Sequence, residues 1–494
     1  MKTLRRYLPL AGLLITLVAL VCRVMSDFCQ PDYKDRYQWA KCLTEGLLPY
    51  RDFNMLQTPL SLWYYSVFFR FSRSVHTGLL AASLLILLTA LFCILIAKQI
   101  RPDAGAFPIA LWTAAMLLGQ GSIYTSMSVM LWAAALYCYF RYRAHPCIGW
   151  LIPAAVLCNL CFFAKQNAGA LCLLSLGLCF LLQWIRTKTP LKTALAHMAV
   201  LVLCYAACWG LWLLYFAKQG ILRDFADSCL FSAGSFVSAQ TYRLEALREL
   251  LPKTALMLGF CLLLKCPEMG ITGACMLWLA YPISNNPMLL PALSMPALAV
   301  SAARLPESGK IKRTGTAILL AGGYLLLGQK ALENAYFQLL ITGKTGYNYY
   351  AAMRTVQYPE NGDFKAVAAD LESRFHDGLL PYLEAHRDTV SDYHIADTLG
   401  AFYNIAFDRY DKYYDLFLSG NLGARTPLDV VSETIAQEPG HYFIVWADAE
   451  SQSVPGFLDA AALEAIDSIR QRCTLRETLY QPDGTPSYCI YQIP

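Results

Sequence analysis

Long apolar runs separated by short polar loops fill the first 345 residues of the chain. Eleven of these runs predict membrane-crossing helices, because each approaches the length needed to span the hydrocarbon core of a bilayer. Several are shorter than the ~20 residues of a straight span, so some of these helices should be broken or end elsewhere. The runs lie near 7–26, 76–98, 105–119, 122–140, 147–163, 168–185, 193–217, 250–265, 270–284, 287–303 and 314–340.

Two apolar segments need a separate interpretation. The N-terminal 25 residues resemble a signal peptide, but no small-residue cleavage site precedes Ser26 and further spans follow, so we expect a retained first helix. The second segment is Pro59–Phe71. If it crossed the membrane, every later loop would change sides. We therefore expect a helix that lies on the membrane surface or is only partly inserted.

Composition and charge agree with a membrane protein. The chain is 56% hydrophobic and only 15% charged, with a formal net charge of +5. The Lys and Arg residues cap spans and form no patch, which argues against nucleic-acid binding. By the positive-inside rule, the loops that carry them face the cytoplasm together with the N-terminus, and the C-terminal segment lies outside. These loops are 98–101, 141–143, 186–192 and 304–313.

From about residue 346 onward, charged residues, Pro and Gly occur at the frequencies of soluble proteins. We predict a mainly α fold: a polytopic helical membrane bundle over 1–345, with about eleven spans, and a small extracytoplasmic α/β domain over 346–494. In the domain we expect two helices, one strand and a hairpin around a Pro-Asp-Gly-Thr turn. These are Asp363–Phe375, Phe457–Arg470, His441–Trp446, and Thr474–Tyr480 with Ser487–Ile493.

The 18 cysteines do not suggest a disulfide framework. Most of them lie inside apolar runs, where a thiol packs as a small hydrophobic group. Two pairs outside the predicted spans could form disulfides, Cys29 with Cys42 and Cys473 with Cys489. The sequence leaves both pairings open.

A polar loop over 27–58 follows the first predicted span and holds most of the candidate chemistry. A carboxylate at this depth could accept a proton from an incoming hydroxyl or amine, although any single Asp is more often an ordinary solubilising charge. Within the loop, a short helix is expected to end at Gly46 as its C-cap. The four aspartates of the loop are Asp27, Asp32, Asp35 and Asp52.

Part of this loop follows the pattern D-x(13)-G-x-x-P-Y-x-D, and a Pro-Leu pair then opens the next apolar segment. The pattern resembles the GT-C glycosyltransferases, more narrowly the bacterial relatives of the protein O-mannosyltransferases and of the lipid A aminoarabinose transferase. The resemblance implies transfer of a sugar from a polyprenyl phosphate carrier to an acceptor outside the cell membrane. It also implies that Asp32 is the catalytic carboxylate, with Asp35 as the second candidate. The pattern consists of Asp32, Gly46, Pro49, Tyr50, Asp52, Pro59 and Leu60.

The same resemblance points to a site for the donor phosphate. A Lys-Gln pair between two apolar runs, here Lys165 and Gln166, recurs in these relatives, and its ammonium could pair with a phosphate. The alternative is a lysine that only reaches the membrane interface. Gln57 stands where many relatives carry a basic residue. Arg51, Lys165 or Arg243 could compensate for this change; otherwise the donor differs or activity is lost.

Two other classes of function remain open. A transporter or lipid-carrier flippase would need ionisable residues near the middle of its spans, and the predicted spans hold few. A non-catalytic relative that binds cell-envelope components is the other alternative. We predict no cofactor; the outer-loop carboxylates could hold a divalent cation, but no ligand pair can be named. His76, His145 and His197 lie near span ends and are interpreted as interfacial.

Overall fold

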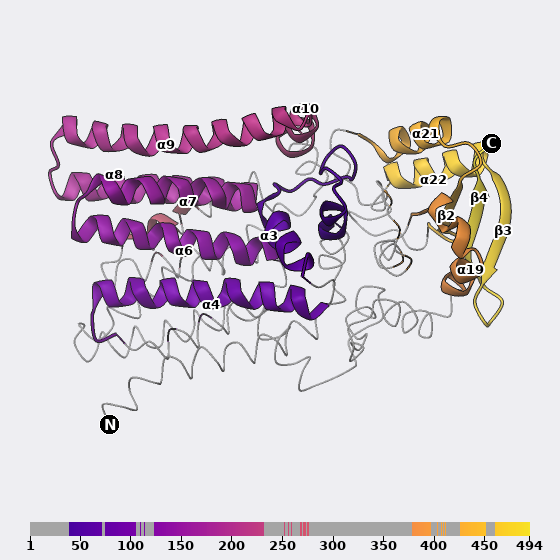
Figure 1. Cartoon of the computed structure of the whole chain (residues 1–494), viewed down its shortest axis with the longest axis horizontal. Helices are drawn as coiled ribbons and strands as arrows, with labels where there is room; N and C mark the ends of the chain where they lie inside the picture. Colours follow the sequence, from indigo (N-terminus) through magenta and orange to yellow (C-terminus); the bar gives the residue numbers. More distant parts are fainter. Residues whose placement is uncertain are drawn as a thin grey trace, which may run out of the picture.

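The structure is a computed structural model that describes residues 39–71, 75–104, 123–231, 378–396, 425–450 and 460–494, with isolated residues between these ranges. In the described part the chain is mostly helical and carries one small sheet (Figure 1). The predicted spans at 7–26, 287–303 and 314–340 and the predicted helix Asp363–Phe375 lie outside the described residues. Only single residues of 105–119, 250–265 and 270–284 are described.

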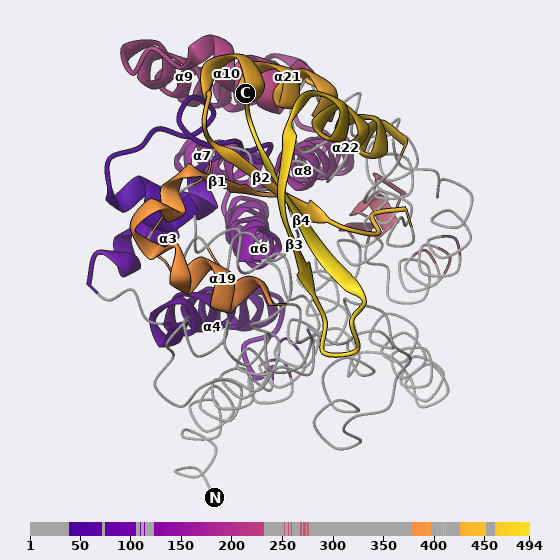
Figure 2. The ribbon, with the colours of Figure 1, turned by 90° about the vertical axis from the view of Figure 1, so that its right-hand side faces the viewer.

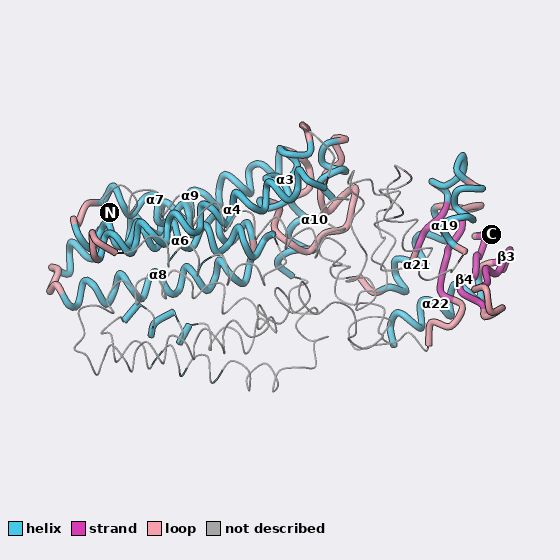
Figure 3. The backbone as a smooth tube through the Cα atoms, turned by 90° about the horizontal axis from the view of Figure 1, so that it is seen from below, coloured by secondary structure: helices cyan, strands magenta, loops and turns pink. Residues whose placement is uncertain are grey.

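Five of the predicted apolar runs fall on described helices, which Figure 3 shows lying along one another, away from the strands. Among the described residues, two helices, α8 and α9, are long and apolar enough to cross a membrane. A short 3₁₀ turn, η1 (Ile148–Trp150), precedes α7. The five helices are α4 (Val75–Ile100), α6 (Ile123–Ala144), α7 (Leu151–Ala164), α8 (Gln166–Arg186) and α9 (Leu191–Lys218).

Small side chains allow the helices of this bundle to approach closely. Helix α6 packs against α4 and α7, and α7 also packs against α8 and α9. Ala133 and Ala135 of α6, and Ala154 and Ala155 of α7, are buried in the bundle. Helix interfaces in membranes use such residues because van der Waals packing has to replace a hydrophobic driving force between helices.

Basic residues collect at one end of the bundle. Helices α4, α6 and α8 each carry Lys or Arg in the last turn. Figure 1 shows the connection between α8 and α9 at the end of the bundle farthest from the sheet. One of these residues, Arg143, forms an ion pair with the buried Glu268 at 2.7 Å. The basic residues are Lys98, Arg141, Arg143 and Arg186.

A helix, α3 (Leu60–Phe69), is present where the sequence predicted one over 59–71. It buries one face, including Leu62, Tyr65 and Phe69, and packs against α4 and α7. The hydroxyl of Tyr64 donates a hydrogen bond to the carbonyl of Ala81 in α4 at 2.7 Å. The helix is therefore fixed to the bundle; whether it lies on the membrane surface stays a prediction.

The C-terminal part contains a four-stranded sheet in the order β1-β2-β4-β3, flanked by helices (Figure 2). Strands β1 and β2 are parallel, and the other two pairs are antiparallel. The predicted strand and hairpin are confirmed, and the predicted second helix corresponds to α22. The elements are α19 (Leu379–Ala385), η5 (Arg387–Asp392), β1 (Tyr393–Ile395), α21 (Pro427–Gln437), β2 (Tyr442–Trp446), α22 (Ala460–Arg472), β3 (Thr474–Tyr480) and β4 (Pro486–Gln492).

Strand β2 is covered on both faces of the sheet, whereas most side chains of β3 are exposed. Successive side chains of a strand point to opposite faces, and in β2 this alternation separates two hydrophobic clusters. Phe443 and Val445 pack with residues of α21 and α22. Ile444 belongs to a larger cluster that also contains residues of the helical bundle. A hydrogen bond also links the N-terminal and C-terminal parts of the chain: the ammonium of Lys41 donates to the carbonyl of Arg409 at 3.2 Å. The boundary predicted at 345/346 lies outside the described residues and stays a prediction.

Of the two disulfides considered from the sequence, the one between Cys473 and Cys489 does not form, and the other, Cys29 with Cys42, involves a residue outside the described ones. Cys42, Cys473 and Cys489 are free thiols, and Cys29 lies outside the described residues. Cys473 directly precedes Thr474, which pairs with Gln492, so it sits about four residues out of register with Cys489. At ~3.3 Å per residue, that offset is far beyond the reach of a disulfide. Burial raises the pKa of the Cys42 thiol to about 12, so this thiol stays protonated.

We expect Thr426→Ala to destabilise the start of α21 by about 1 kcal/mol, because a capping box would be lost. The Thr426 hydroxyl accepts from the Asp429 N–H at 3.1 Å, and an Asp429 carboxylate oxygen accepts from the Thr426 N–H at 2.9 Å. Hydrogen–deuterium exchange over 427–437 should be faster in the variant and unchanged in Thr389→Ala, an exposed control. Equal exchange rates in both variants would contradict the assignment.

The same cap has a pH dependence with a defined sign. Hydrogen bonds from the backbone N–H and the hydroxyl of Thr426 lower the pKa of Asp429. Its contribution is therefore complete above the usual pKa of an aspartate and is lost as the pH falls through the lowered, folded-state pKa.

Candidate functional site

The loop predicted to carry the chemistry begins with the C-cap that the sequence indicated. A helix described from Trp39 to Thr44 ends in a turn at Gly46, whose φ is +87°. The N–H of Leu47 donates to the carbonyl of Cys42 at 3.0 Å, which closes the helix end. A left-handed residue with this bond is the usual glycine cap. Trp39 and Cys42 are buried, so the helix is anchored.

Asp52 has a structural role in the loop. One of its carboxylate oxygens accepts from the N–H of Leu48 at 2.8 Å, and Arg51 Nε donates to the other, also at 2.8 Å. Between Leu48 and Asp52 in the chain, Tyr50 adopts a positive φ of 71°, and its N–H donates to the carbonyl of Phe53 at 2.9 Å. Asp52 therefore closes a tight turn, and the exposed Arg51 side chain is held against it.

Tyr50 anchors the second half of the loop. Its hydroxyl donates to the carbonyl of Gln57 at 2.9 Å, and its ring makes edge contacts with Phe216 and Phe225. Burial raises the pKa of Tyr50 well above its usual range, so the phenol remains a neutral donor. The motif tyrosine thus fixes the backbone at Gln57 to the far end of α9.

The following residues of the loop lie on the junction between α7 and α8. The amide of Gln166 donates to the carbonyl of Leu56 at 2.8 Å. The hydroxyl of Thr58 donates to the carbonyl of Phe162 at 2.9 Å. The Cys229 thiol adds a contact to the Leu56 carbonyl at 3.2 Å. Each of these bonds joins residues that are more than a hundred positions apart in the sequence.

Lys165 is the single residue between α7 and α8, and its backbone is extended, with φ −159° and ψ 116°. Its ammonium donates to the Thr125 hydroxyl at 3.1 Å and lies 5.0 Å from the centre of the Tyr124 ring, both at the start of α6. The side chain is half-buried. A partly desolvated cation next to hydroxyl and amide groups is suited to binding an anion such as a phosphate.

Gln57 brings a second polar group to this end of the bundle. Its side-chain oxygen is buried and has no hydrogen-bond partner among the residues that the structure describes. An amide in this setting can hydrogen-bond a ligand but cannot neutralise its charge. The structure thus places Gln57 in the loop that contacts the Lys165–Gln166 junction, and their binding of a donor phosphate stays a prediction. The sequence did not indicate Thr125 or Tyr124. The only indication of Thr125 and Tyr124 in the sequence is a run of polar residues at the start of an otherwise apolar helix.

The remaining predicted residues divide into two groups. Gly46, Pro49, Tyr50 and Asp52 build the loop, and Pro59 precedes α3 as its N-cap residue. The proposed bases, Asp32 and Asp35, and the candidate cation Arg243 lie outside the described residues, so their roles stay predictions.

His197, interpreted from the sequence as interfacial, is instead buried. Its ring nitrogen lies 2.6 Å from the hydroxyl of Tyr142, which also accepts a hydrogen bond from the Trp184 indole.

No protein-family model and no curated protein matches the chain. Among the solved structures that match, two are similar over 98% of both chains. One is ArnT from Cupriavidus metallidurans bound to undecaprenyl phosphate, with 12% identity and a TM-score of 0.48. The other is ArnT from the same organism in the apo state, with 13% identity and a TM-score of 0.47.

We expect Gly169→Ala to disrupt the α7–α8 junction. A Cβ at this position would lie 2.1 Å from the Cα of Phe162, so the two helices would have to separate. The Thr58–Phe162 and Gln166–Leu56 hydrogen bonds would be strained at the same time. Overpacking of this kind costs at least ~1–3 kcal/mol, and the variant should show a lower melting temperature in detergent.

Gly177→Ala is the matched control, because Gly177 lies in the same helix as Gly169 and a Cβ there meets nothing within 4 Å. Its melting temperature should be unchanged or slightly higher, since alanine favours the helix. Equal destabilisation by both substitutions would show that the junction is not tightly packed.

Proposed function

We propose that the chain is an integral membrane glycosyltransferase that moves a sugar from a polyprenyl phosphate donor to an extracytoplasmic acceptor. The observation that carries the proposal is the convergence of the loop over 48–58 with the Lys165 junction. Gln166 and Thr58 hold the two together through hydrogen bonds of 2.8 and 2.9 Å. This arrangement brings the motif that resembles the GT-C enzymes next to a half-buried cation.

The helices support a membrane location. In α9, Leu203, Leu211 and Leu214 each expose about two thirds of their surface in the described part of the chain. A row of exposed leucines on a 28-residue apolar helix is suited to lipid and costly in water. The positive-inside rule favours an orientation with the basic ends of α4, α6 and α8 in the cytoplasm. The N-terminus would then be cytoplasmic, and the Lys165 junction and the C-terminal domain would face outward.

A lipid-linked sugar would bind with its phosphate at the junction. The Lys165 ammonium supplies charge, and the Gln57 and Gln166 amides lie in the same region. Arg51 and Arg243 are further candidates to offset the missing basic residue at position 57. A donor of this class has the same phosphate-linked polyprenyl chemistry as the undecaprenyl phosphate bound to one ArnT structure.

In the proposed reaction, the acceptor is a hydroxyl or amine. The Asp32 carboxylate, or Asp35 as the second candidate, accepts its proton while the acceptor atom bonds to the anomeric carbon of the sugar. The bond from that carbon to the phosphate oxygen breaks, and its electron pair remains on the phosphate. Lys165 stabilises this developing charge. Attack from the face opposite the phosphate inverts the anomeric configuration.

We expect Asp32→Asn to abolish transfer, because an amide cannot take up the proton. Incorporation of radiolabelled sugar from a polyprenyl-phosphate donor in membranes measures transfer, and immunoblotting of membranes measures insertion. Asp27→Asn in the same loop is the control and should leave both unchanged. Normal transfer by Asp32→Asn would remove this residue from the mechanism; the same test on Asp35→Asn decides the second candidate.

We expect Lys165→Gln to lower kcat/KM for the donor about tenfold to a hundredfold, since a hydrogen bond to a charged group contributes about 1.5–3 kcal/mol. Lys165→Arg keeps the charge and should retain more activity. Lys218→Gln, an exposed lysine in the last turn of α9, is the matched control. An equal, small effect of both glutamine substitutions would mean that Lys165 only reaches the membrane interface.

A further inference from the structure

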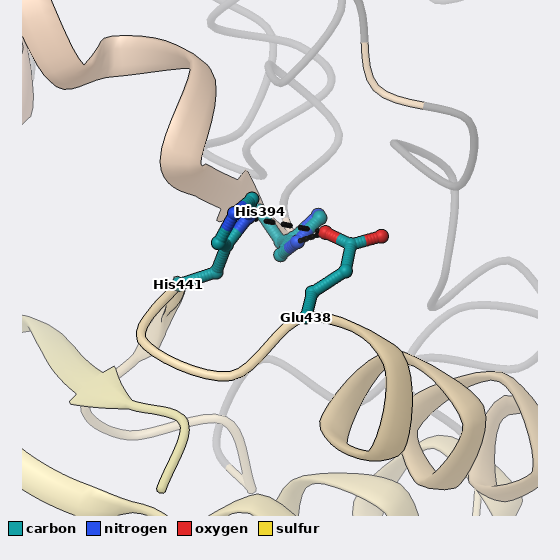
Figure 4. Close-up of side chains that lie close together, drawn as sticks. All are labelled: His394, Glu438 and His441. Atoms are coloured by element: carbon teal, nitrogen blue, oxygen red, sulfur yellow. Dashed lines mark hydrogen bonds and ion pairs between the residues drawn. The ribbon is translucent and has the colours of Figure 1, made fainter.

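A cluster of two histidines and one glutamate lies in the C-terminal part, apart from the glycosyltransferase site. Figure 4 shows His394, Glu438 and His441 with their side chains directed toward one another. The ligand atoms of the three residues all lie within 4.8 Å of one another. His394 Nε2 is 2.8 Å and His441 Nδ1 3.1 Å from the same carboxylate oxygen of Glu438.

The backbone explains why these residues meet. In the parallel pair of β1 and β2, His394 is opposite Phe443, so His441, two residues earlier, is on the same side as His394. Glu438 and His441 are the first and last residues of a tight turn: the His441 N–H donates to the Glu438 carbonyl at 3.3 Å. Pro439 and Gly440 fit the two central positions of a type II turn, because the second of these positions needs a positive φ and Gly440 has a φ of +88°.

The end of β4 holds this turn in place. The N–H of Gly440 donates to the carbonyl of Ile493 at 3.1 Å, and the N–H of Ile493 donates to the carbonyl of His441 at 2.8 Å. The Gln492 amide also donates to the Gly440 carbonyl at 3.2 Å. Glu438 and His441 are thus fixed before any ligand binds, and preorganisation of this kind is what a selective site needs.

A second carboxylate orients His394 from behind. Asp411 is buried and lies 3.3 Å from Nδ1 of His394, which leaves Nε2 directed at Glu438. Asp411 is paired with the buried Arg409, whose guanidinium donates to the carbonyls of Val390 and Tyr393. A carboxylate on the outer nitrogen of a ligating histidine is the usual second layer of a metal site.

The carboxylates around the cluster also favour a cation. His394 lies between two of them, with Asp411 3.3 Å from Nδ1 and Glu438 2.8 Å from Nε2. Nδ1 of His441 is buried and, despite its closeness to Glu438, makes no hydrogen bond with any residue that the structure describes. This nitrogen is therefore a candidate ligand atom beside the Glu438 carboxylate.

We propose that His394, Glu438 and His441 bind one divalent transition-metal ion, for which Zn²⁺ is the best match. Two imidazoles and one carboxylate suit Zn²⁺ rather than Mg²⁺ or Ca²⁺, which prefer oxygen ligands. In a tetrahedral Zn²⁺ site two ligand atoms lie about 3.3 Å apart, because each is ~2.0–2.1 Å from the ion. Small side-chain rotations would lengthen the contacts of 2.8 and 3.1 Å to Glu438 to this separation. The partial exposure of Glu438 and His441 leaves a route for entry and a fourth position for water. The ion would link β1 to the turn before β2.

The test uses the full-length protein in detergent, stripped of metal with a chelator and then titrated with Zn²⁺. We expect one tight equivalent that is lost, or weakened at least tenfold, in His441→Ala and retained in His386→Ala, a histidine outside the cluster. Asp411→Asn should weaken binding about tenfold to a hundredfold without removing a ligand. Size-exclusion profiles confirm that each variant is folded.

Co²⁺ provides a spectroscopic check that a purely structural role of these residues would not affect. With the wild-type protein, the Co²⁺ spectrum should show no thiolate charge-transfer band. His441→Cys, which keeps a ligand atom, should restore binding relative to His441→Ala and produce that band. Absence of tight Zn²⁺ binding to the wild-type protein, or equal binding by His441→Ala, would overturn the proposal.

Discussion

The described structure depends on one contact above the others, the docking of residues 56–58 onto the α7–α8 junction. Two side-chain-to-backbone hydrogen bonds, Gln166 to Leu56 and Thr58 to Phe162, connect the loop to the helices. Each bond joins a side chain to a backbone carbonyl more than a hundred residues away in the sequence, and the Cys229 thiol adds a second contact to the Leu56 carbonyl. The loop is therefore part of the bundle and not a flexible connection, and Lys165 keeps a defined position beside it.

Local patterns predicted the regular elements well. The apolar runs marked the described helices within a few residues, and the Pro-Asp-Gly-Thr turn marked the hairpin of β3 and β4. Both follow from the local sequence, which needs no knowledge of distant residues. Strand register decides the pairing of Cys473 with Cys489, which the sequence left open: the two residues are near in sequence, but the register separates them.

The functional residues were predicted less completely, because a sequence shows charges but not their partners. Asp52 looked equivalent to the other acidic residues of its loop, yet its carboxylate closes a turn. Gln57 and Lys165 were joined through a resemblance, since no periodicity connects positions 108 residues apart. The Glu-Pro-Gly-His turn, which carries two ligands of the proposed metal site, could have been recognised from the local sequence. The third ligand, His394, could not, because only the pairing of β1 with β2 brings it next to the turn.

The bundle and the sheet share interior. Ile444 and Ile490, on one face of the sheet, belong to the same buried cluster as Trp132 and Phe163 of the bundle. Cutting the chain between the two parts would expose that face to water, and the released fragment would tend to aggregate. The sheet is therefore not an independent module that could be moved to another protein. A change in the tilt of the bundle helices would be transmitted to it directly through the shared cluster.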